Sequence, residues 1–169
     1  MTRARPGGHP NRVIPRAVGD VFAHIVVAVD GTEASREALD HAAHLARQDG
    51  AVLTGVFVVD SQWDDFIGHD WQNTERTRRG FLDYIRRGQD SQAREARGQF
   101  ERATEGLRQA RFALREGDPL TVLLDLASAP STDLLIIGRG VCRVTGRPSL
   151  KALGRNLAQR AQRPVLLLP

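Results

Sequence analysis

The sequence predicts an α/β protein built on one open, doubly wound sheet of parallel strands. Short runs rich in Val, Ile and Leu are typical of strands that are buried on both faces. Segments with apolar residues at helical spacing separate these runs, and strands that alternate with helices form parallel sheets. The chain has 169 residues, of which 41% are hydrophobic, and no internal repeat is detectable. One domain with a single core therefore accounts for most of the chain.

The first strand, helix and strand form the clearest unit. Residues 22–30, FAHIVVAVD, predict a buried strand that closes with Asp30. Thr32 is a typical N-cap for the next helix, in which alanines recur at helical spacing, and Gly50 ends that helix. Residues 51–59, AVLTGVFVV, predict the second strand. Because the turns are short, we expect a βαβ unit with a parallel strand pair.

The segment at about 61–90 is the hardest to assign. It reads as a polar helical insertion that carries both tryptophans, Trp63 and Trp71, and the aromatic pair Phe81 and Tyr84. Exposed tryptophans are costly unless they cover a pocket or a partner. The segment could form a lid over a ligand crevice, a docking surface, or a satellite cluster on the sheet, and the sequence leaves these three alternatives open.

The second half of the chain continues the alternation of helices and strands. Pro119 suits the first turn of a helix because its missing N–H has no partner there in any case. The predicted elements are a helix over 93–107, a strand over 111–115, a helix over 120–127, a strand over 133–137, a helix from Ser149 to about 162, and a strand over 164–168.

Residues 1–20 predict a disordered basic tail, which leaves 21–169 as the domain. The tail holds three prolines, three glycines and four arginines without an apolar period. Such a segment cannot bury enough surface to offset the entropy of an ordered chain.

Composition excludes several classes of protein. The 24 basic residues outnumber the 20 acidic ones by four, but they are scattered, and Lys151 is the only lysine, so we expect no nucleic-acid partner. No stretch approaches the roughly 18 apolar residues of a membrane helix, and no signal peptide is evident. Cys142 is the only cysteine, so no intramolecular disulfide can form. We therefore expect a cytoplasmic protein without a membrane association.

The sequence also lacks the residues of a catalytic or metal centre. No nucleophile elbow, Walker loop or complete set of Ser, His and acid is present. His41 and His44 share one helix face, but a pair without a third ligand is usually only a polar face. We expect a binding protein with no metal, and not an enzyme.

Five motifs resemble the universal stress protein family. They are, in chain order, HIVVAVDGTEAS, VVD after the second strand, REGDP, DLLIIGRG and RPVLLLP. The likeness covers roughly 22–60 and 111–169, and the middle segment has no counterpart. The resemblance implies an adenine nucleotide alpha hydrolase-like sheet with strand order 3-2-1-4-5. In such a sheet, ligands bind in the crevice between strands one and four, where the strand order reverses.

The resemblance implies ATP or AMP as the ligand of that crevice. Asp30 matches the position at which the family meets the base or ribose, and Gly31 and Thr32 follow it in the expected site. Val58 matches the position on strand two whose backbone frames the base. Asp30 could instead cap the next helix or be solvated at the end of its strand.

The phosphates of family members lie on a glycine motif after strand four. Its pattern is Gly, two residues, Gly, nine residues, Gly, then Ser or Thr, because glycine lets backbone N–H groups approach anionic oxygens. Gly138 holds the first place here, but the other places fall on Val141, Lys151 and Ala152. Tight binding of ATP in the usual pose is therefore in doubt.

Positive charge could replace the missing glycines as the phosphate partner. Arg139, Arg143, Arg147 and Lys151 crowd this loop, and we place Arg139, Gly140 and Lys151 in the anion site. The alternative is that the arginines are simply solvated.

Two functions follow from these observations. The first is a homodimeric stress-response module in which an adenine nucleotide or another anion in the crevice controls the binding of an unidentified protein partner. The resemblance implies that the apolar edge strand 164–168 pairs with its twin in the dimer. The second is a nucleotide-independent adaptor that recognises its partner with the aromatic segment, and weak nucleotide hydrolysis is a third alternative.

Overall fold

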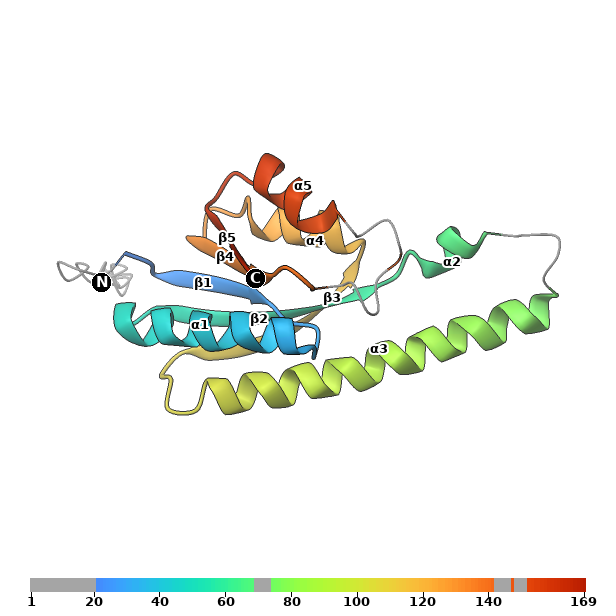
Figure 1. Ribbon diagram of the computed structural model, residues 1–169, viewed down its shortest axis with the longest axis horizontal. Coiled ribbons are helices and arrows are strands. Elements are labelled where there is room, and N and C mark those ends of the chain that lie inside the picture. Colours follow the sequence, from blue (N-terminus) through green and yellow to red (C-terminus); the bar gives the residue numbers. More distant parts are fainter. Residues whose placement is uncertain (1–20, 69–73, 142–146, 148–151) are drawn as a thin grey trace, which may run out of the picture.

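A computed structural model of the chain describes residues 21–68, 74–141, 147 and 152–169. Within these residues, the strands form one parallel sheet in the order β3-β2-β1-β4-β5, which confirms the predicted fold class and strand order (Figure 1). The strands are β1 (His24–Ala28), β2 (Val52–Asp60), β3 (Ala110–Gly117), β4 (Leu134–Gly138) and β5 (Val165–Leu168). The helices are α1 (Glu33–Asp49), α2 (Trp63–Ile67), α3 (Glu75–Ala103), α4 (Pro119–Leu126) and α5 (Leu153–Arg160).

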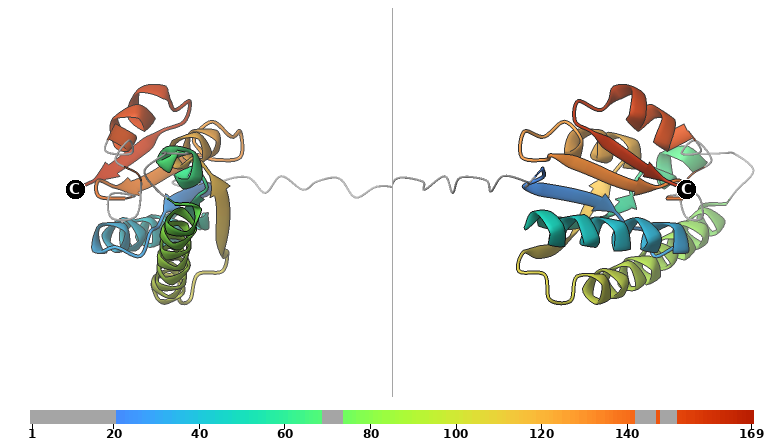
Figure 2. Two further views of the ribbon diagram at one scale, coloured as in Figure 1. Left: turned by 90° about the vertical axis from the view of Figure 1, so that its right-hand side faces the viewer. Right: turned by 60° about the vertical axis from the view of Figure 1, so that its left-hand side comes forward.

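The helices cover both faces of the sheet, as Figures 1 and 2 show. Helices α1 and α3 pack on one face, and α4 and α5 pack on the other. Side chains of β1 alternate between these two layers, with Ile25 and Val27 toward α1 and with Val26 and Ala28 toward α4 and α5. All four side chains are at most 2% exposed. Burial on both faces explains why the strand sequence is continuously apolar.

Helix α1 has the predicted ends. Thr32 is the N-cap, and its side chain accepts a hydrogen bond from the Ser35 N–H at 3.3 Å. Gly50 is the C-cap, with the left-handed backbone (φ +63°) that favours glycine. The buried alanines between these caps allow close packing on the sheet, and they include Ala38, Ala42 and Ala46.

Helix α3 is longer than the predicted helix over 93–107. It has 29 residues and includes much of the polar segment before residue 93. Its second half packs on the sheet through Ala96 and Phe100, while its first half extends past the end of the sheet beside α2 (Figure 1). That first half has few apolar residues, and ion pairs such as Arg79 with Glu75 at i, i+4 support it instead.

Helix α5 is shorter than predicted. Ala152 occupies its N-cap position without a side-chain hydrogen bond, and the predicted cap Ser149 lies outside the described residues. The helix ends at Arg160 because Ala161 already has an extended backbone. The predicted tail 1–20 and Trp71 also lie outside the described part of the chain.

Candidate functional site

The carboxyl ends of β1 and β4 lie side by side. These two strands are parallel neighbours, and Val27 pairs with Ile136 in their register. Asp30 follows the end of β1, and Gly138 is the last residue of β4, so both stand at the same edge of the sheet. Strand order reverses between these strands, since β2 and β3 lie on one side and β5 lies on the other. The edge that holds Asp30 and Gly138 is therefore the topological switch point of the sheet.

The Asp30 carboxylate organises the turn between β1 and α1. Asp30 is 4% exposed, and its Oδ1 accepts hydrogen bonds from the N–H and the hydroxyl of Thr32, at 3.0 and 2.6 Å. Its own N–H donates to Ser35 Oγ at 3.2 Å. Asp30 is therefore neither the cap of α1, which is Thr32, nor a solvated residue, and its carboxylate orients the turn at the position where a ligand role is also expected.

Glycine at position 31 is required by the turn and by α3. Gly31 has φ +79°, and an added Cβ would lie 3.1 Å from the carbonyl oxygen of Gln92 on α3. The Gly31 carbonyl also accepts a hydrogen bond from the side chain of Gln99 at 3.0 Å. The positive φ of the turn and the close contact with α3 both favour glycine at this position.

Gly138 is also a point of close packing. An added Cβ would lie 2.4 Å from the carbonyl oxygen of Ala34, in the first turn of α1. At Gly140 the Cβ would lie 3.2 Å from the side chain of Ala34. Between them, the N–H of Arg139 donates to the Leu168 carbonyl of β5 at 2.7 Å, and the Arg139 side chain is exposed. This stretch therefore joins β4 to α1 and β5.

Val141, at the second place of the glycine motif, is a core residue. It is 4% exposed and packs with Leu153 and Leu157 of α5, and its N–H donates to the Gly138 carbonyl at 3.1 Å. Its side chain is therefore turned into the core. Lys151, at the third place, lies outside the described residues, and Ala152 is exposed at the start of α5.

Arg147 makes an ion-pair cluster that the sequence did not predict. Its Nε lies 2.8 Å from the carboxylate of Asp60, and its Nη2 lies 2.5 Å from that of Asp118. Asp60 ends β2, and Asp118 is the N-cap of α4, so the cluster spans the carboxyl ends of β2 and β3. The Arg147 side chain is only 12% exposed, so it is neither solvated nor free to hold a phosphate in this structure. Sequence spacing carries no signal for this cluster.

The cluster shifts the pKa values of two of its members. Partial burial acts to raise the pKa of Asp118, but hydrogen bonds from the N–H and hydroxyl of Thr121 and from Arg147 outweigh it and hold that pKa below its usual range. Burial acts to lower the pKa of Arg147, but hydrogen bonds to the two carboxylates raise it overall. Both shifts favour the charged pair.

Asp60 is also held by α3. Its N–H donates to Gln89 Oε1 at 2.6 Å, and its carbonyl accepts from Gln89 Nε2 at 3.2 Å. A cavity of about 290 Å³ adjoins this contact, between the end of β2 and the helices α2 and α3, and Trp63 also lines it. Val58, two residues earlier on β2, is half-buried against the α4 layer.

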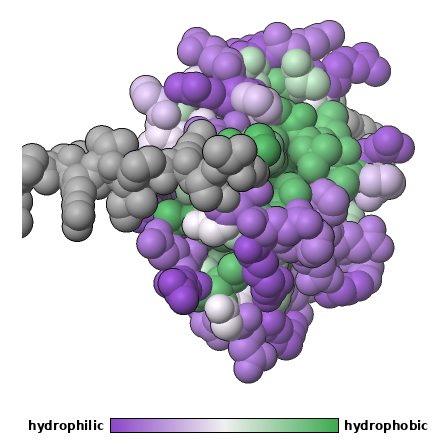
Figure 3. Space-filling model, turned by 90° about the vertical axis from the view of Figure 1, so that its left-hand side faces the viewer, coloured by the Kyte–Doolittle hydropathy of each residue, from purple (hydrophilic) through white to green (hydrophobic). Residues whose placement is uncertain are grey.

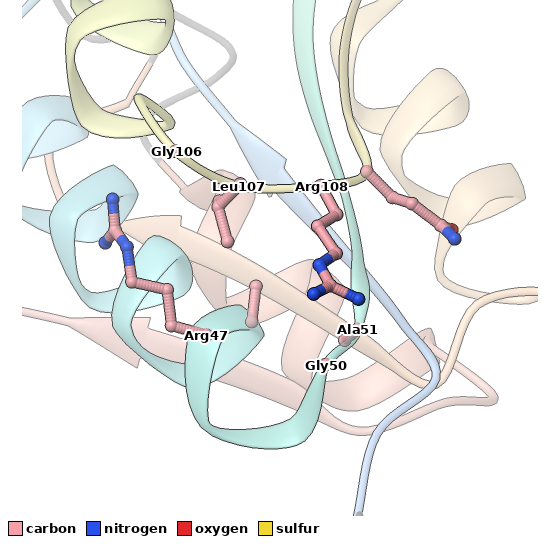
Figure 4. Close-up of a pocket in the computed structure, with 8 residues that line it drawn as sticks. Arg47, Gly50, Ala51, Gly106, Leu107 and Arg108 are labelled. Atoms are coloured by element: carbon pink, nitrogen blue, oxygen red, sulfur yellow. The ribbon is translucent and has the colours of Figure 1, made fainter.

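A larger pocket lies at the opposite edge of the sheet. It has a volume of about 440 Å³ and is formed around the end of α1 and the loop before β3 (Figure 4). The Arg47 side chain turns away from Ala51 and donates to the Ala103 carbonyl at 2.7 Å, whereas the Arg108 side chain extends toward Ala51. Because this pocket is at the amino ends of the strands, it is separate from the site at the switch point.

No group of three His, Cys, Asp or Glu side chains suited to a metal ion occurs within the described ranges. His24 instead contacts the Ser131 carbonyl and the Thr54 hydroxyl, both at 2.8 Å. Among the described helices, none has the length and apolar character needed to cross a membrane.

Solved structures of other proteins share this fold. Universal stress protein UspA from Lactobacillus plantarum has a TM-score of 0.66 at 20% identity, over 88% of this chain and 98% of that one. A universal stress protein in complex with cAMP has a TM-score of 0.56 at 23% identity, over 88% and 97%. The universal stress protein from Archaeoglobus fulgidus in complex with dAMP has a TM-score of 0.57 at 16% identity, over 88% and 99%.

Comparison of the sequence with other protein sequences identifies the family of this chain. No curated protein matches the chain significantly. The sequence model of the universal stress protein family matches residues 22–169, which is nearly the whole of the predicted domain. The chain therefore belongs to the universal stress protein family.

Proposed function

We propose that this protein is a stress-response binding module that takes an adenine nucleotide or another anion at the carboxyl ends of β1 and β4. It acts in the cytoplasm as a homodimer. Binding of a ligand in the crevice controls the binding of a protein partner, and the protein catalyses no reaction. The observation that carries the proposal is the position of Asp30 and Gly138 on neighbouring strands at one edge of the sheet. Membership of the family and the cAMP and dAMP complexes of similar proteins support it.

The charges at this edge favour a ligand with few phosphates. Asp30, Asp60 and Asp118 all lie there, and two of these carboxylates already take up the charge of Arg147. Carboxylates accept hydrogen bonds from ribose hydroxyls or amino groups, but they repel phosphates. Among the described residues of the predicted anion site, Arg139 is the basic side chain left to balance a phosphate. We expect AMP or a cyclic nucleotide to bind at least as tightly as ATP.

The edge strand β5 supports a dimer. It pairs with β4 on one side only, and Leu167 on it is 38% exposed. Figure 3 shows a hydrophobic area on the side of the molecule that β5 borders. An unpaired apolar edge invites association with another chain, and pairing with the twin strand would cover it.

A thermal-shift titration with ATP, AMP and cAMP tests the nucleotide site. A ligand at 100 times its dissociation constant adds about 2.7 kcal/mol of stability. The Arg139→Ala and Lys151→Ala variants should reduce the shift if charge holds the phosphate. Asp30→Asn should weaken binding because an amide oxygen is a weaker acceptor than a carboxylate for ribose hydroxyls or amino groups, while it keeps an oxygen for Thr32. The absence of a shift with all three nucleotides would refute the proposal and favour the nucleotide-independent adaptor.

A further inference from the structure

The guanidinium of Arg147 has hydrogen-bond donors that its two carboxylate partners do not use. A guanidinium carries five N–H donors. The Nε–H donates to Asp60 Oδ2 at 2.8 Å, and Nη2 donates to Asp118 Oδ1 at 2.5 Å. The third nitrogen, Nη1, makes no hydrogen bond to a described residue, and it is not one of the buried polar atoms that lack a partner. The outer end of this guanidinium is therefore accessible to a further acceptor.

The two carboxylate partners of Arg147 differ in burial. The Asp60 side chain is 4% exposed, whereas the Asp118 side chain is 32% exposed. A carboxylate that loses its cation in the interior costs far more than one that water reaches. The contact with Asp60 is thus a fixed part of the fold, and the contact with Asp118 is the one that an external anion can replace.

Asp118 can release Arg147 without losing its role as a helix cap. Its Oδ2 accepts hydrogen bonds from the N–H and the hydroxyl of Thr121, at 3.0 and 2.9 Å. Only its other oxygen, Oδ1, contacts Arg147. A break between Asp118 and Arg147 therefore leaves the start of α4 intact.

A phosphate group has the chemistry to take the place of Asp118. Arginine binds carboxylates and phosphates in the same way, through parallel N–H···O bonds. A phosphate monoester carries about −1.5 to −2 charge at pH 7, more than a carboxylate, and it can accept from Nη1 and Nη2 together. Phosphate and the Asp118 carboxylate therefore compete for the same donor.

The position of Arg147 suits a nucleotide that is held at Asp30. Ala28 pairs with Val56, and the Val29 N–H donates to the Val56 carbonyl, so this register puts Asp30 level with residue 58 of β2. Asp60, the partner of Arg147, lies two residues further along β2. This offset is roughly 7 Å along the strand and about 5 Å across to it. A single nucleotide spans such a distance between its base or ribose and its phosphate.

We propose that Arg147 binds the phosphate of a nucleotide held at Asp30, and that Asp118 is the internal competitor of this phosphate. The inference rests on the proposed function and adds a binding residue to the same site. Nη2 exchanges the Asp118 carboxylate for a phosphate oxygen, while Nε keeps its contact with Asp60. Asp118 weakens the binding of every phosphate by the same factor. Ligands that also gain contacts near Asp30 are then the ones that bind at low concentration.

Calorimetric titration of the full chain with inorganic phosphate and with AMP tests the proposal, at a temperature where every variant is folded. Asp118→Asn keeps an oxygen for Thr121 but no longer offers a second oxygen to Arg147. Both ligands should then bind roughly tenfold more tightly, because they no longer displace a charge-assisted hydrogen bond. Asp118→Ser keeps a capping hydroxyl and should give the same gain. Glu116→Gln is the matched control, because it removes an equal charge from an exposed side chain of β3 and should change affinity by less than about twofold.

Arg147→Lys tests whether the gain depends on the guanidinium. Lysine keeps a cation for Asp60 but lacks the planar fork that binds two acceptors at once. In this background, Asp118→Asn should change the affinity for either ligand by less than about twofold. An equal gain in both backgrounds would show that the lost charge acts by itself, and would overturn the proposal.

The remaining outcomes separate this proposal from the proposed function. If AMP binds the original chain and Asp118→Asn binds it no more tightly than Glu116→Gln does, the nucleotide site stands and the role of Arg147 is refuted. If Asp118→Asn binds phosphate through Arg147 but no variant prefers AMP to phosphate, the competition stands and the nucleotide site is refuted. The absence of binding of both ligands to every variant would overturn both.

Discussion

The Nε of Arg147 lies 2.8 Å from the carboxylate of Asp60, although 87 residues separate the two in the chain. Asp60 is almost fully buried, with a side chain that is 4% exposed. A buried carboxylate stays charged only when a cation and hydrogen bonds compensate for the lost water. Arg147 lies in the segment between β4 and α5, and its contact with Asp60 therefore stabilises the carboxyl end of β2.

Arg147→Met should destabilise the protein strongly. The variant keeps the apolar stem but leaves Asp60 buried without its cation, and we expect a loss of about 3 kcal/mol in the free energy of unfolding. Urea denaturation measures this loss. Arg139→Met is the matched control, because Arg139 is exposed and its substitution should change stability by no more than about 0.5 kcal/mol. Equal effects of the two substitutions would show that the Asp60 contact contributes nothing.

Stability should fall in acid because of Asp118. Its folded-state pKa lies below the unfolded value of about 3.9, so its contribution is fully present above that value and is lost as the pH falls through the folded-state pKa. Asp118→Asn keeps an N-cap oxygen for Thr121 but removes the charge beside Arg147. Urea denaturation at several pH values between 6 and 3 should therefore give a shallower pH dependence for Asp118→Asn. The same slope for both proteins would contradict the role of this carboxylate.

The fold was predictable because its signals are local. The apolar run of β1, the caps of α1 at Thr32 and Gly50, and the turn with Asp118 and Pro119 each follow from neighbouring residues. Helix α3 was predicted only in part, since its first half contacts little of the sheet and has no apolar stripe of core residues. Such a segment carries a weak periodic signal, and its helical form depends on ion pairs and on continuation of the packed half.

The candidate site was predictable in position but not in its contacts. The motifs placed Asp30 and Gly138 at one edge, because strand ends can be read from the sequence. The close approach of Gly138 to Ala34 and the pairing of Arg147 with Asp60 and Asp118 depend on segments far apart in the chain. Without coordinates, a glycine needed for packing and a glycine needed for a ligand look alike.

Val141→Gly should destabilise the domain, even though it moves the sequence toward the family motif. The side chain is 4% exposed among Leu153 and Leu157, and its removal together with the added chain entropy of glycine should cost about 3 kcal/mol. Val141→Ala should cost less, because it keeps the backbone restriction. Urea denaturation of both variants measures these losses.

The same substitution tests whether backbone access limits ATP binding. Lys151→Gly with Ala152→Ser restores two places of the glycine motif, and adding Val141→Gly restores the third. If access at position 141 is limiting, only the triple variant should bind ATP more tightly in calorimetry, at a temperature where all variants are folded. Equal ATP affinity of the double and triple variants would contradict a role for that backbone position.

Gly138→Ala separates packing from ligand access at the first place of the motif. The added Cβ would lie 2.4 Å from the Ala34 carbonyl oxygen, and since that atom belongs to the backbone of α1, the helix itself must shift. We expect a loss of about 2 kcal/mol in the free energy of unfolding without any nucleotide present. Gly140→Ala is the control, because its Cβ would meet only the Ala34 methyl at 3.2 Å and the gain in chain stiffness offsets the crowding. A Gly138→Ala variant with unchanged stability and weakened nucleotide binding would instead assign this glycine to the ligand alone.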